Sequence, residues 1–275
     1  MRWLLLRGLI RESRHWLDFP NEFRARVRSP DGKPTEVIFV DLPGFGTQND
    51  AIVPDTVPEF VGDMRRRLRQ QVPEGEQIGI VAVSLGGMVA LNWLASFPQD
   101  FACGVIINSS LGDVSPVWHR MRPQNWPNIL RAPLMSAPAR ERMLLSMTRQ
   151  QGDLDKDAAR YAEIARLTVP KSKNALAQLR AAIKVKSPTS ISVPTLVLAS
   201  LGDELVSWRC SEAIANRLSL PLKLHEALGA DAAGHDLPVD QPAWVCDRIN
   251  ELVDSLAARP PGAQSPSPSS EARHA

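Results

Sequence analysis

Short apolar segments recur along the chain and predict the strands of a buried sheet. Each is apolar throughout, without polar alternation, which is typical of strands covered on both faces of a parallel sheet. The segments are Trp3 to Leu6, Val37 to Val40, Ile78 to Val83, Gly104 to Ile107, Thr195 to Ala199 and, as a weaker pattern, Leu222 to Leu228.

Segments of helical length with amphipathic spacing separate most of these runs. They are His15 to Val27, Val57 to Gln71, Leu85 to Phe97, Cys210 to Leu218 and Pro242 to Leu256. Strands that alternate with helices predict an α/β fold with a doubly wound, mostly parallel sheet, and right-handed crossovers leave few topologies.

Residues 112–188 interrupt this alternation, because they contain helical stretches and no convincing strand. We expect a helical cap at 112–188 that lies over an α/β core formed by residues 1–111 and 189–258. The Pro/Ser-rich end, 259–275, has little to bury and is expected to be disordered. The helical stretches of the cap are Arg140 to Arg149, Ala158 to Leu167 and Asn174 to Ile183.

The composition of the chain indicates which classes of partner it could bind and in which compartment we expect it. The 275 residues are 44% apolar and 23% charged, as in an ordinary globular protein. A net charge of +2 does not suit a nucleic-acid binder, and no stretch is long enough to span a membrane. Arg7 interrupts the apolar start, and the three scattered cysteines suit a reducing compartment, so we expect a cytoplasmic protein.

The third apolar run leads through Ser84 into a predicted helix, which is the context of a nucleophile elbow. The backbone must reverse sharply at this serine, so small residues are needed two positions away on either side, where Ala82 and Gly86 stand. The helix N-terminus that follows places backbone N–H groups where negative charge would develop. The pattern therefore predicts that Ser84 is a nucleophile.

A catalytic serine needs a base, and the base needs an orienting acid. Of the five histidines, His235 is preferred because it lies in a loop after the last predicted strand, where a parallel sheet builds its site; His15 is the second candidate.

For the acid, Asp203 is preferred because it follows the fifth strand at a turn signal. Asp113, after the fourth strand, is its main competitor and stays open as the acid. Glu204 and Asp236 are weaker candidates for the acid, and the alternative interpretation is that they are solvated loop charges.

At these residues the sequence resembles the α/β-hydrolase superfamily, over nearly the whole chain from Trp3 to about Leu256. The resemblance implies that Ser84 attacks an acyl carbon, and that the backbone N–H groups of Leu85 and Leu9 form the oxyanion hole. The order Ser, Asp, His is also that of this fold. The motifs that carry the resemblance are Val83-Ser84-Leu85-Gly86-Gly87, Asp41-Leu42-Pro43-Gly44-Phe45-Gly46, Gly202-Asp203-Glu204-Leu205-Val206 and Gly234-His235-Asp236.

The sequence departs from the family pattern in three ways. Ala82 stands where the family usually has glycine, and alanine is small enough for the turn. Arg7 stands where a His-Gly pair usually has its histidine. We expect the two N-terminal strands common in the family to be absent, which leaves about six strands, all parallel.

Together these residues predict a serine hydrolase that cleaves a carboxylic ester or thioester through an acyl-enzyme, without a metal or organic cofactor. Two alternatives stay open: an acyltransferase that uses the same triad, and a non-catalytic member of the fold that binds a ligand. A dinucleotide-binding protein is excluded, because no Gly-x-Gly-x-x-Gly turn follows the first strand.

The predicted cap carries a concentration of positive charge. Residues 113–186 contain 14 Lys/Arg and 6 Asp/Glu, a net charge of +8. This charge could steer a small acyl substrate that is anionic or bound to an acidic carrier, or it could be an ordinary solvated surface. Trp118, Met121 and Trp126 could line an acyl pocket or could pack the cap onto the core.

Overall fold

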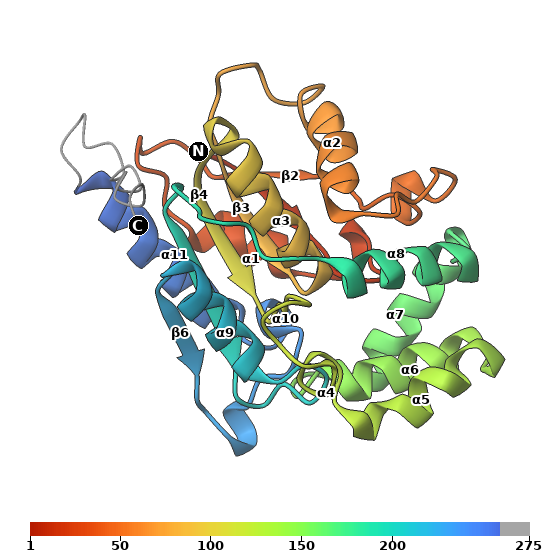
Figure 1. Ribbon diagram of the computed structural model, residues 1–275. Helices are drawn as coiled ribbons and strands as arrows, with labels where there is room; N and C mark the ends of the chain where they lie inside the picture. The colour runs from red at the N-terminus through yellow and green to blue at the C-terminus, as the bar shows by residue number, and fades with distance from the viewer. Residues whose placement is uncertain (259–275) are drawn as a thin grey trace, which may run out of the picture.

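The computed structural model describes residues 1–258, and in them a parallel sheet has helices on both faces, as the sequence predicts (Figure 1). The six strands are all parallel, in the order β2-β1-β3-β4-β5-β6. The predicted disordered end, 259–275, lies outside the described residues. The strands are β1 Arg2–Leu6, β2 Glu36–Phe39, β3 Ile78–Val83, β4 Phe101–Ile107, β5 Thr195–Ser200 and β6 Leu222–His225.

Two hydrophobic clusters fill the spaces on either side of the sheet. One joins the strands to α2, α3 and α9, and the other joins them to α1 and α11. β3 is buried along its whole length, which explains why its sequence is apolar without alternation. These helices are α1 Phe19–Arg26, α2 Val57–Leu68, α3 Leu85–Ser96, α9 Trp208–Leu218 and α11 Pro242–Ala257.

The helix expected from His15 to Val27 is divided. Ser13–Trp16 forms a short 3-10 helix, and α1 starts only at Phe19. Pro20, in the first turn of α1, lacks an N–H and would clash with the carbonyl four residues earlier, so one helix cannot run through. Leu17 has a positive φ of 51° at the break.

Helical segments connect β4 to β5, and Figure 1 shows α5, α6 and α7 beside the arrowhead end of the sheet. The division into a core and a cap at residues 112 and 188 stays a prediction. No helix within residues 1–258 is both long enough and apolar enough to cross a membrane. The helices of this insertion are α4 Val117–Arg120, η4 Pro123–Asn125, α5 Trp126–Arg131, η5 Ala132–Leu134, α6 Ala137–Thr148, α7 Leu154–Leu167 and α8 Ser172–Lys184.

Candidate active site

Ser84 lies in the turn between β3 and α3 and has an unusual backbone conformation. Its φ is 57° and its ψ is −121°. A strained backbone conformation of this kind typically costs about 1–3 kcal/mol and is found most often at functional sites. The Ser84 N–H donates to the Ile107 carbonyl at 3.0 Å. The turn is crowded, because a Cβ at Gly86 would lie 2.5 Å from the Arg7 carbonyl oxygen. The glycine at this position is therefore a steric requirement.

The loop after β1 lies directly against Ser84. A Cβ at Gly8 would be 2.9 Å from the Ser84 Cβ and 3.5 Å from its Oγ, so a larger residue would push the loop away from the serine. The predicted oxyanion donors, Leu9 and Leu85, follow these two residues in the chain. Within residues 1–258, neither N–H donates a hydrogen bond to another protein group. Both N–H groups are therefore free to stabilise a developing negative charge.

Ile10 gives the same loop a second strained position. Its φ is 55°, which is rare for a β-branched residue. The Ile10 N–H donates to Gln178 Oε1 at 3.0 Å, and Gln178 Nε2 donates to the Pro43 carbonyl at 3.0 Å. Gln178 lies on α8 and is fully buried, so it holds the predicted oxyanion loop in place. Sequence reasoning missed it; the only signal is a glutamine on the buried face of an amphipathic helix.

His235 and Asp203 come together at the ends of the last two strands of the chain. His235 Nδ1 lies 2.7 Å from Asp203 Oδ2, and both side chains are buried. The second carboxylate oxygen of Asp203 accepts hydrogen bonds from the N–H groups of Leu205 and Val206 at 2.9 and 2.8 Å. These bonds fix the plane of the carboxylate, which in turn orients the imidazole.

The competing candidates make other contacts. The carboxylate of Asp113 accepts from the N–H and the hydroxyl of Ser187, at 2.9 and 2.6 Å. His15 Nδ1 accepts from the Glu12 N–H at 3.1 Å, and its ring packs edge-on against Tyr161 with centroids 4.5 Å apart. The structure thus brings Asp203 to His235, and it gives Asp113 and His15 structural partners.

Asn108, directly after β4, connects the histidine loop to the sheet. Its Nδ2 donates to the carbonyls of Gly234 and His235 at 3.2 and 2.9 Å, and its Oδ1 accepts from the Ser200 N–H at 3.0 Å. The residue is buried and has a φ of 45°, a conformation that asparagine tolerates better than most residues. An asparagine at the end of a buried strand was the available signal, and sequence reasoning missed this residue.

Arg7 forms a buried ion pair with Asp236, which corrects the interpretation of Asp236 as a solvated charge. Two parallel hydrogen bonds join their side chains, at 2.7 and 2.8 Å. The guanidinium also lies 4.7 Å from the centre of the Trp16 ring. Burial alone would lower the pKa of Arg7, but the facing carboxylate raises it, and Arg7 lowers the pKa of Asp236 against the effect of burial. The pair links the loop after β1 to the residue that follows His235.

A second buried carboxylate, Asp240, holds the other side of the histidine loop. It accepts from the N–H groups of Gly234 and Gln150, each at 2.8 Å, and from the guanidinium of Arg149. A Cβ at Gly234 would lie only 2.6 Å from the Thr148 carbonyl oxygen. Burial raises the pKa of Asp240, although Arg149 opposes this effect. The end of α6 is therefore packed directly on the histidine loop.

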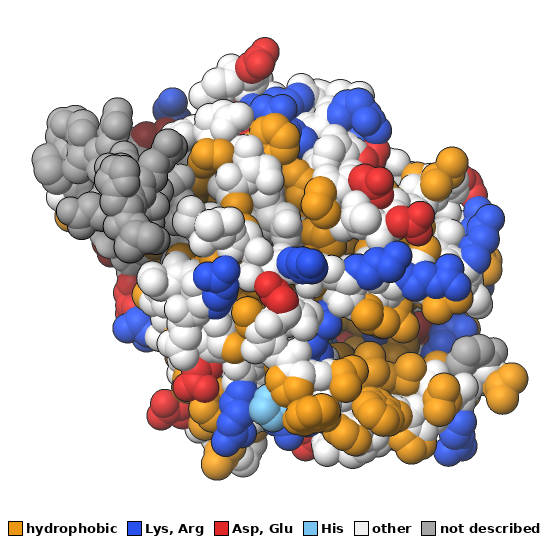
Figure 2. Space-filling view, viewed as in Figure 1, with side chains coloured by type: hydrophobic (Ala, Val, Ile, Leu, Met, Phe, Trp, Pro, Cys, Tyr) orange, Lys and Arg blue, Asp and Glu red, His pale blue; other side chains and the backbone are white. Residues whose placement is uncertain are grey.

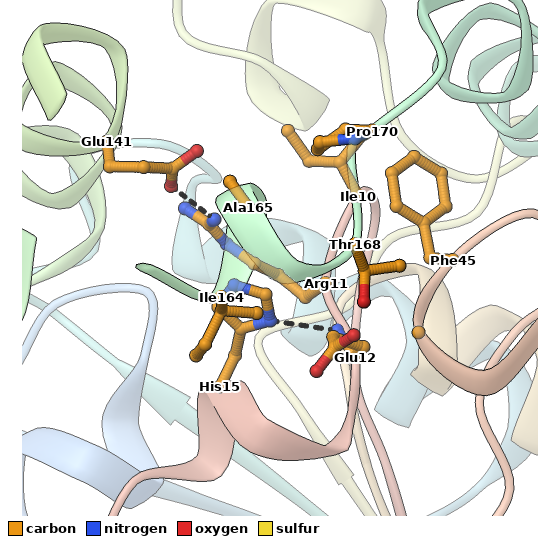
Figure 3. A pocket seen from close by; sticks show the side chains of 11 residues that line it. Ile10, Arg11, Glu12, His15, Phe45, Glu141, Ile164, Ala165, Thr168 and Pro170 are labelled. Atoms are coloured by element: carbon orange, nitrogen blue, oxygen red, sulfur yellow. Dashed lines mark hydrogen bonds and ion pairs between the residues drawn. The ribbon is translucent and has the colours of Figure 1, made fainter. Parts of the chain in front are cut away.

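A small cavity lies beside the loop after β1, and Figure 3 shows His15, Glu12 and the Arg11–Glu141 ion pair at its wall. Its volume is about 20 Å³, which is room for roughly one water molecule. Burial and the nearby cation of Arg11 hold the pKa of His15 well below 6.5. The cavity is therefore too small for an acyl substrate, and the neutral imidazole belongs to the packing of its wall.

The three residues predicted for an acyl pocket lie at the outside of the insertion. Trp118 is 57% exposed and Trp126 is 43% exposed, and Met121 is half-buried. The Trp126 indole N–H donates to the Met121 carbonyl at 3.2 Å. Their role in lining an acyl pocket stays a prediction. Residues 1–258 contain no group of three or more His, Cys, Asp or Glu that could hold a metal ion.

Comparisons with known proteins agree with the fold. The family model described as alpha/beta hydrolase family matches residues 3–248. No curated protein sequence matches the chain. Among solved structures, a bacterial membrane phospholipase A is similar, at 20% identity and a TM-score of 0.69, over 94% of this chain and 80% of that one.

Two further solved structures are similar over comparable lengths. One is 2-hydroxy-6-oxo-6-phenylhexa-2,4-dienoate hydrolase from Rhodococcus, with 17% identity, a TM-score of 0.69, and coverage of 92% and 90% of the two chains. The other is a thermophilic esterase from Thermogutta terrifontis, with 18% identity, a TM-score of 0.64, and coverage of 94% and 90%. At these identities the likenesses show the shared fold alone.

Proposed function

Because the chain belongs to the alpha/beta hydrolase family, we propose that it is a serine hydrolase with Ser84 as nucleophile, His235 as base and Asp203 as acid. The observation that carries the proposal is the buried His235–Asp203 pair, 2.7 Å apart, in a fold whose strained turn presents Ser84. A structural histidine would need no buried carboxylate held by two backbone N–H groups. A carboxylate so fixed is what a catalytic imidazole requires.

In the proposed reaction, the Asp203 carboxylate accepts a hydrogen bond from the Nδ1–H of His235, which leaves the unprotonated Nε2 as the base. His235 removes the Ser84 hydroxyl proton while Oγ bonds to the carbonyl carbon of a carboxylic ester or thioester. The Leu85 and Leu9 N–H groups stabilise the oxyanion, and the leaving group departs with the proton from His235. Water, deprotonated by His235, then releases the acid and restores Ser84.

Labelling with a fluorophosphonate probe tests the nucleophile and its base. We expect covalent modification at Ser84 in the wild type and none in Ser84→Ala or His235→Ala. A folded wild type that the probe does not label would overturn the proposal and favour a non-catalytic, ligand-binding role.

A matched pair of variants tests the acid. Asp203→Asn leaves the size of the side chain unchanged but donates to Nδ1, so the imidazole is held in the wrong tautomer. We expect ester hydrolysis to fall by roughly 10⁴-fold. Asp113→Asn, which alters the contact with Ser187, should retain activity. Short- and long-chain p-nitrophenyl esters and acyl thioesters serve as substrates; equal losses in the two variants would contradict the assignment of Asp203.

A further inference from the structure

Two segments of the insertion, residues 114–136 and 171–186, differ in charge from the rest of the chain. Together they contain eight Lys/Arg and no Asp or Glu. All of the acidic residues of the insertion therefore lie in other segments, chiefly α6 and α7. We call the outer surface of these two segments the basic face.

The same two segments expose most of the large hydrophobic side chains. Within residues 1–258, eleven such side chains are exposed and seven of them lie here. Leu130 and Leu134 are 78% and 89% exposed, so they project from the helices with little protein around them. The others are Val117, Trp118, Trp126, Leu176 and Ile183. Exposed hydrophobic side chains and positive charge therefore occur in the same two segments. Hydrophobic residues scattered singly over a surface would not cluster in this way.

The two segments lie side by side on one side of the molecule. The Arg120 side chain of α4 donates to the Ala182 carbonyl of α8. Figure 2 shows hydrophobic side chains gathered over α4 and α5, a hollow next to them, and a row of Lys and Arg side chains along α8 on the far side of the hollow.

Five of the eight cations of this face have no partner within residues 1–258, whereas Lys171 pairs with Asp50 and Arg120 donates to the Ala182 carbonyl. Arg131, Lys173, Arg180, Lys184 and Lys186 are exposed, and none of them forms an ion pair or a side-chain hydrogen bond within the described part of the chain. Most other arginines of the insertion pair with carboxylates, as Arg142 does with Asp155. The unpaired cations leave a field that attracts an anionic surface.

We propose that the basic face docks onto the surface of a bilayer that contains anionic lipids. Exposed Trp and Leu side chains flanked by Lys and Arg are the composition of helices that lie in the headgroup region, with the apolar groups inserted and the cations on lipid phosphates. The projecting side chains do not require a partner of fixed shape. A protein interface generally mixes donors and acceptors, whereas two segments that contribute eight cations and no carboxylate of their own suit a uniformly negative surface.

Vesicle co-sedimentation of the full chain tests this proposal without using its activity. We expect binding to phosphatidylcholine vesicles that contain phosphatidylglycerol, weaker binding at high salt, and little binding to phosphatidylcholine alone. Because each cation near the surface contributes about 5-fold in partitioning, Lys173→Gln/Arg180→Gln/Lys184→Gln should bind roughly 100-fold more weakly. Leu130→Ser/Leu134→Ser should also bind more weakly. All of these replace exposed side chains, and a melting curve checks folding.

Matched controls remove the same charge, or an exposed leucine, at sites outside the basic face. Lys33→Gln/Lys156→Gln/Lys223→Gln and Leu228→Ser, whose leucine is 71% exposed, should bind nearly as well as the wild type. Three results would overturn the proposal: a wild type that does not bind anionic vesicles, equal losses in the two triple variants, or a dimer in solution that Leu130→Ser/Leu134→Ser dissociates. The last result would assign the face to a second copy of the chain.

Discussion

Replacing one member of the Arg7–Asp236 pair should reveal how firmly the loop after β1 and the histidine loop are joined. Both side chains are almost fully buried, at 6% and 5% exposure, and two hydrogen bonds of 2.7 and 2.8 Å connect them. Asp236→Asn removes the negative charge and leaves the Arg7 guanidinium buried without a counterion. Arg7→Met likewise leaves the Asp236 carboxylate buried without the cation that it pairs with.

The expected magnitude follows from the cost of an unpaired buried charge. Breaking a buried pair by removing one partner typically destabilises a protein by about 3–5 kcal/mol, which corresponds to a fall in melting temperature of about 6–20 °C for a chain of this size. Replacement of both partners by apolar residues of similar volume leaves no charge to desolvate. We therefore expect Arg7→Met/Asp236→Leu to lose less stability than either single variant.

Urea unfolding of the wild type, the two single variants and the double variant measures this coupling. Glu163→Gln provides the control, because Glu163 and Arg166 form an ion pair of the same 2.7 Å length with 53% and 70% of their side chains exposed. An exposed ion pair typically contributes less than about 1 kcal/mol to the free energy of unfolding. If Asp236→Asn cost no more than Glu163→Gln, or if the two single losses simply added in the double variant, the reasoning from burial would be refuted.

Three further predictions concern residues around the site. Asn108→Leu removes the bonds that hold the His235 carbonyl and should lower kcat by roughly 100-fold with a small change in KM; an unchanged kcat with a lower melting temperature would show a purely structural role. Gly86→Ala places a Cβ 2.5 Å from the Arg7 carbonyl oxygen, so we expect a loss of about 1–3 kcal/mol in thermal unfolding together with slower probe labelling; a variant as stable as the wild type would contradict the steric argument. Because burial holds the pKa of His15 well below 6.5, the unfolded chain takes up a proton that the folded chain does not, so stability should fall as the pH drops below 6.5. His15→Asn keeps an acceptor for the Glu12 N–H and should reduce that slope by up to about 1.4 kcal/mol per pH unit in urea unfolding; an unchanged slope would assign the pH dependence to other groups.

The sheet could be predicted because its strands are buried on both faces. Each of the six apolar runs overlaps an observed strand, although the fourth begins earlier, at Phe101. The first helix was predicted as one element because its amphipathic spacing continues across Pro20. The proline interrupts the helix, and the spacing of apolar positions alone does not show such an interruption.

The site could be predicted only in part. Ser84, His235 and Asp203 stand out because each follows a strand, but Asp113 does so as well, and only the folded loops bring one carboxylate to the imidazole. Asn108 and Gln178 bind backbone atoms 126 and 168 residues away. Asp236 finds its arginine 229 residues away. Contacts between residues so far apart in the chain produce no recognisable motif in the sequence, so the roles of these residues could not be predicted from it.

The attachment of α8 bears on how segments could be exchanged between relatives. Gln178 supports Ile10 and Pro43, and one turn earlier Asn174 donates to the carbonyls of Gly44 and Asn49 at 2.9 and 3.0 Å. A chimera that replaces everything between β4 and β5 loses all of these bonds and leaves the loop after β1 unsupported. A graft that stops before α8 retains them. Recombination should therefore tolerate a junction before α8 better than one after it, and natural insertions should accumulate upstream of that helix.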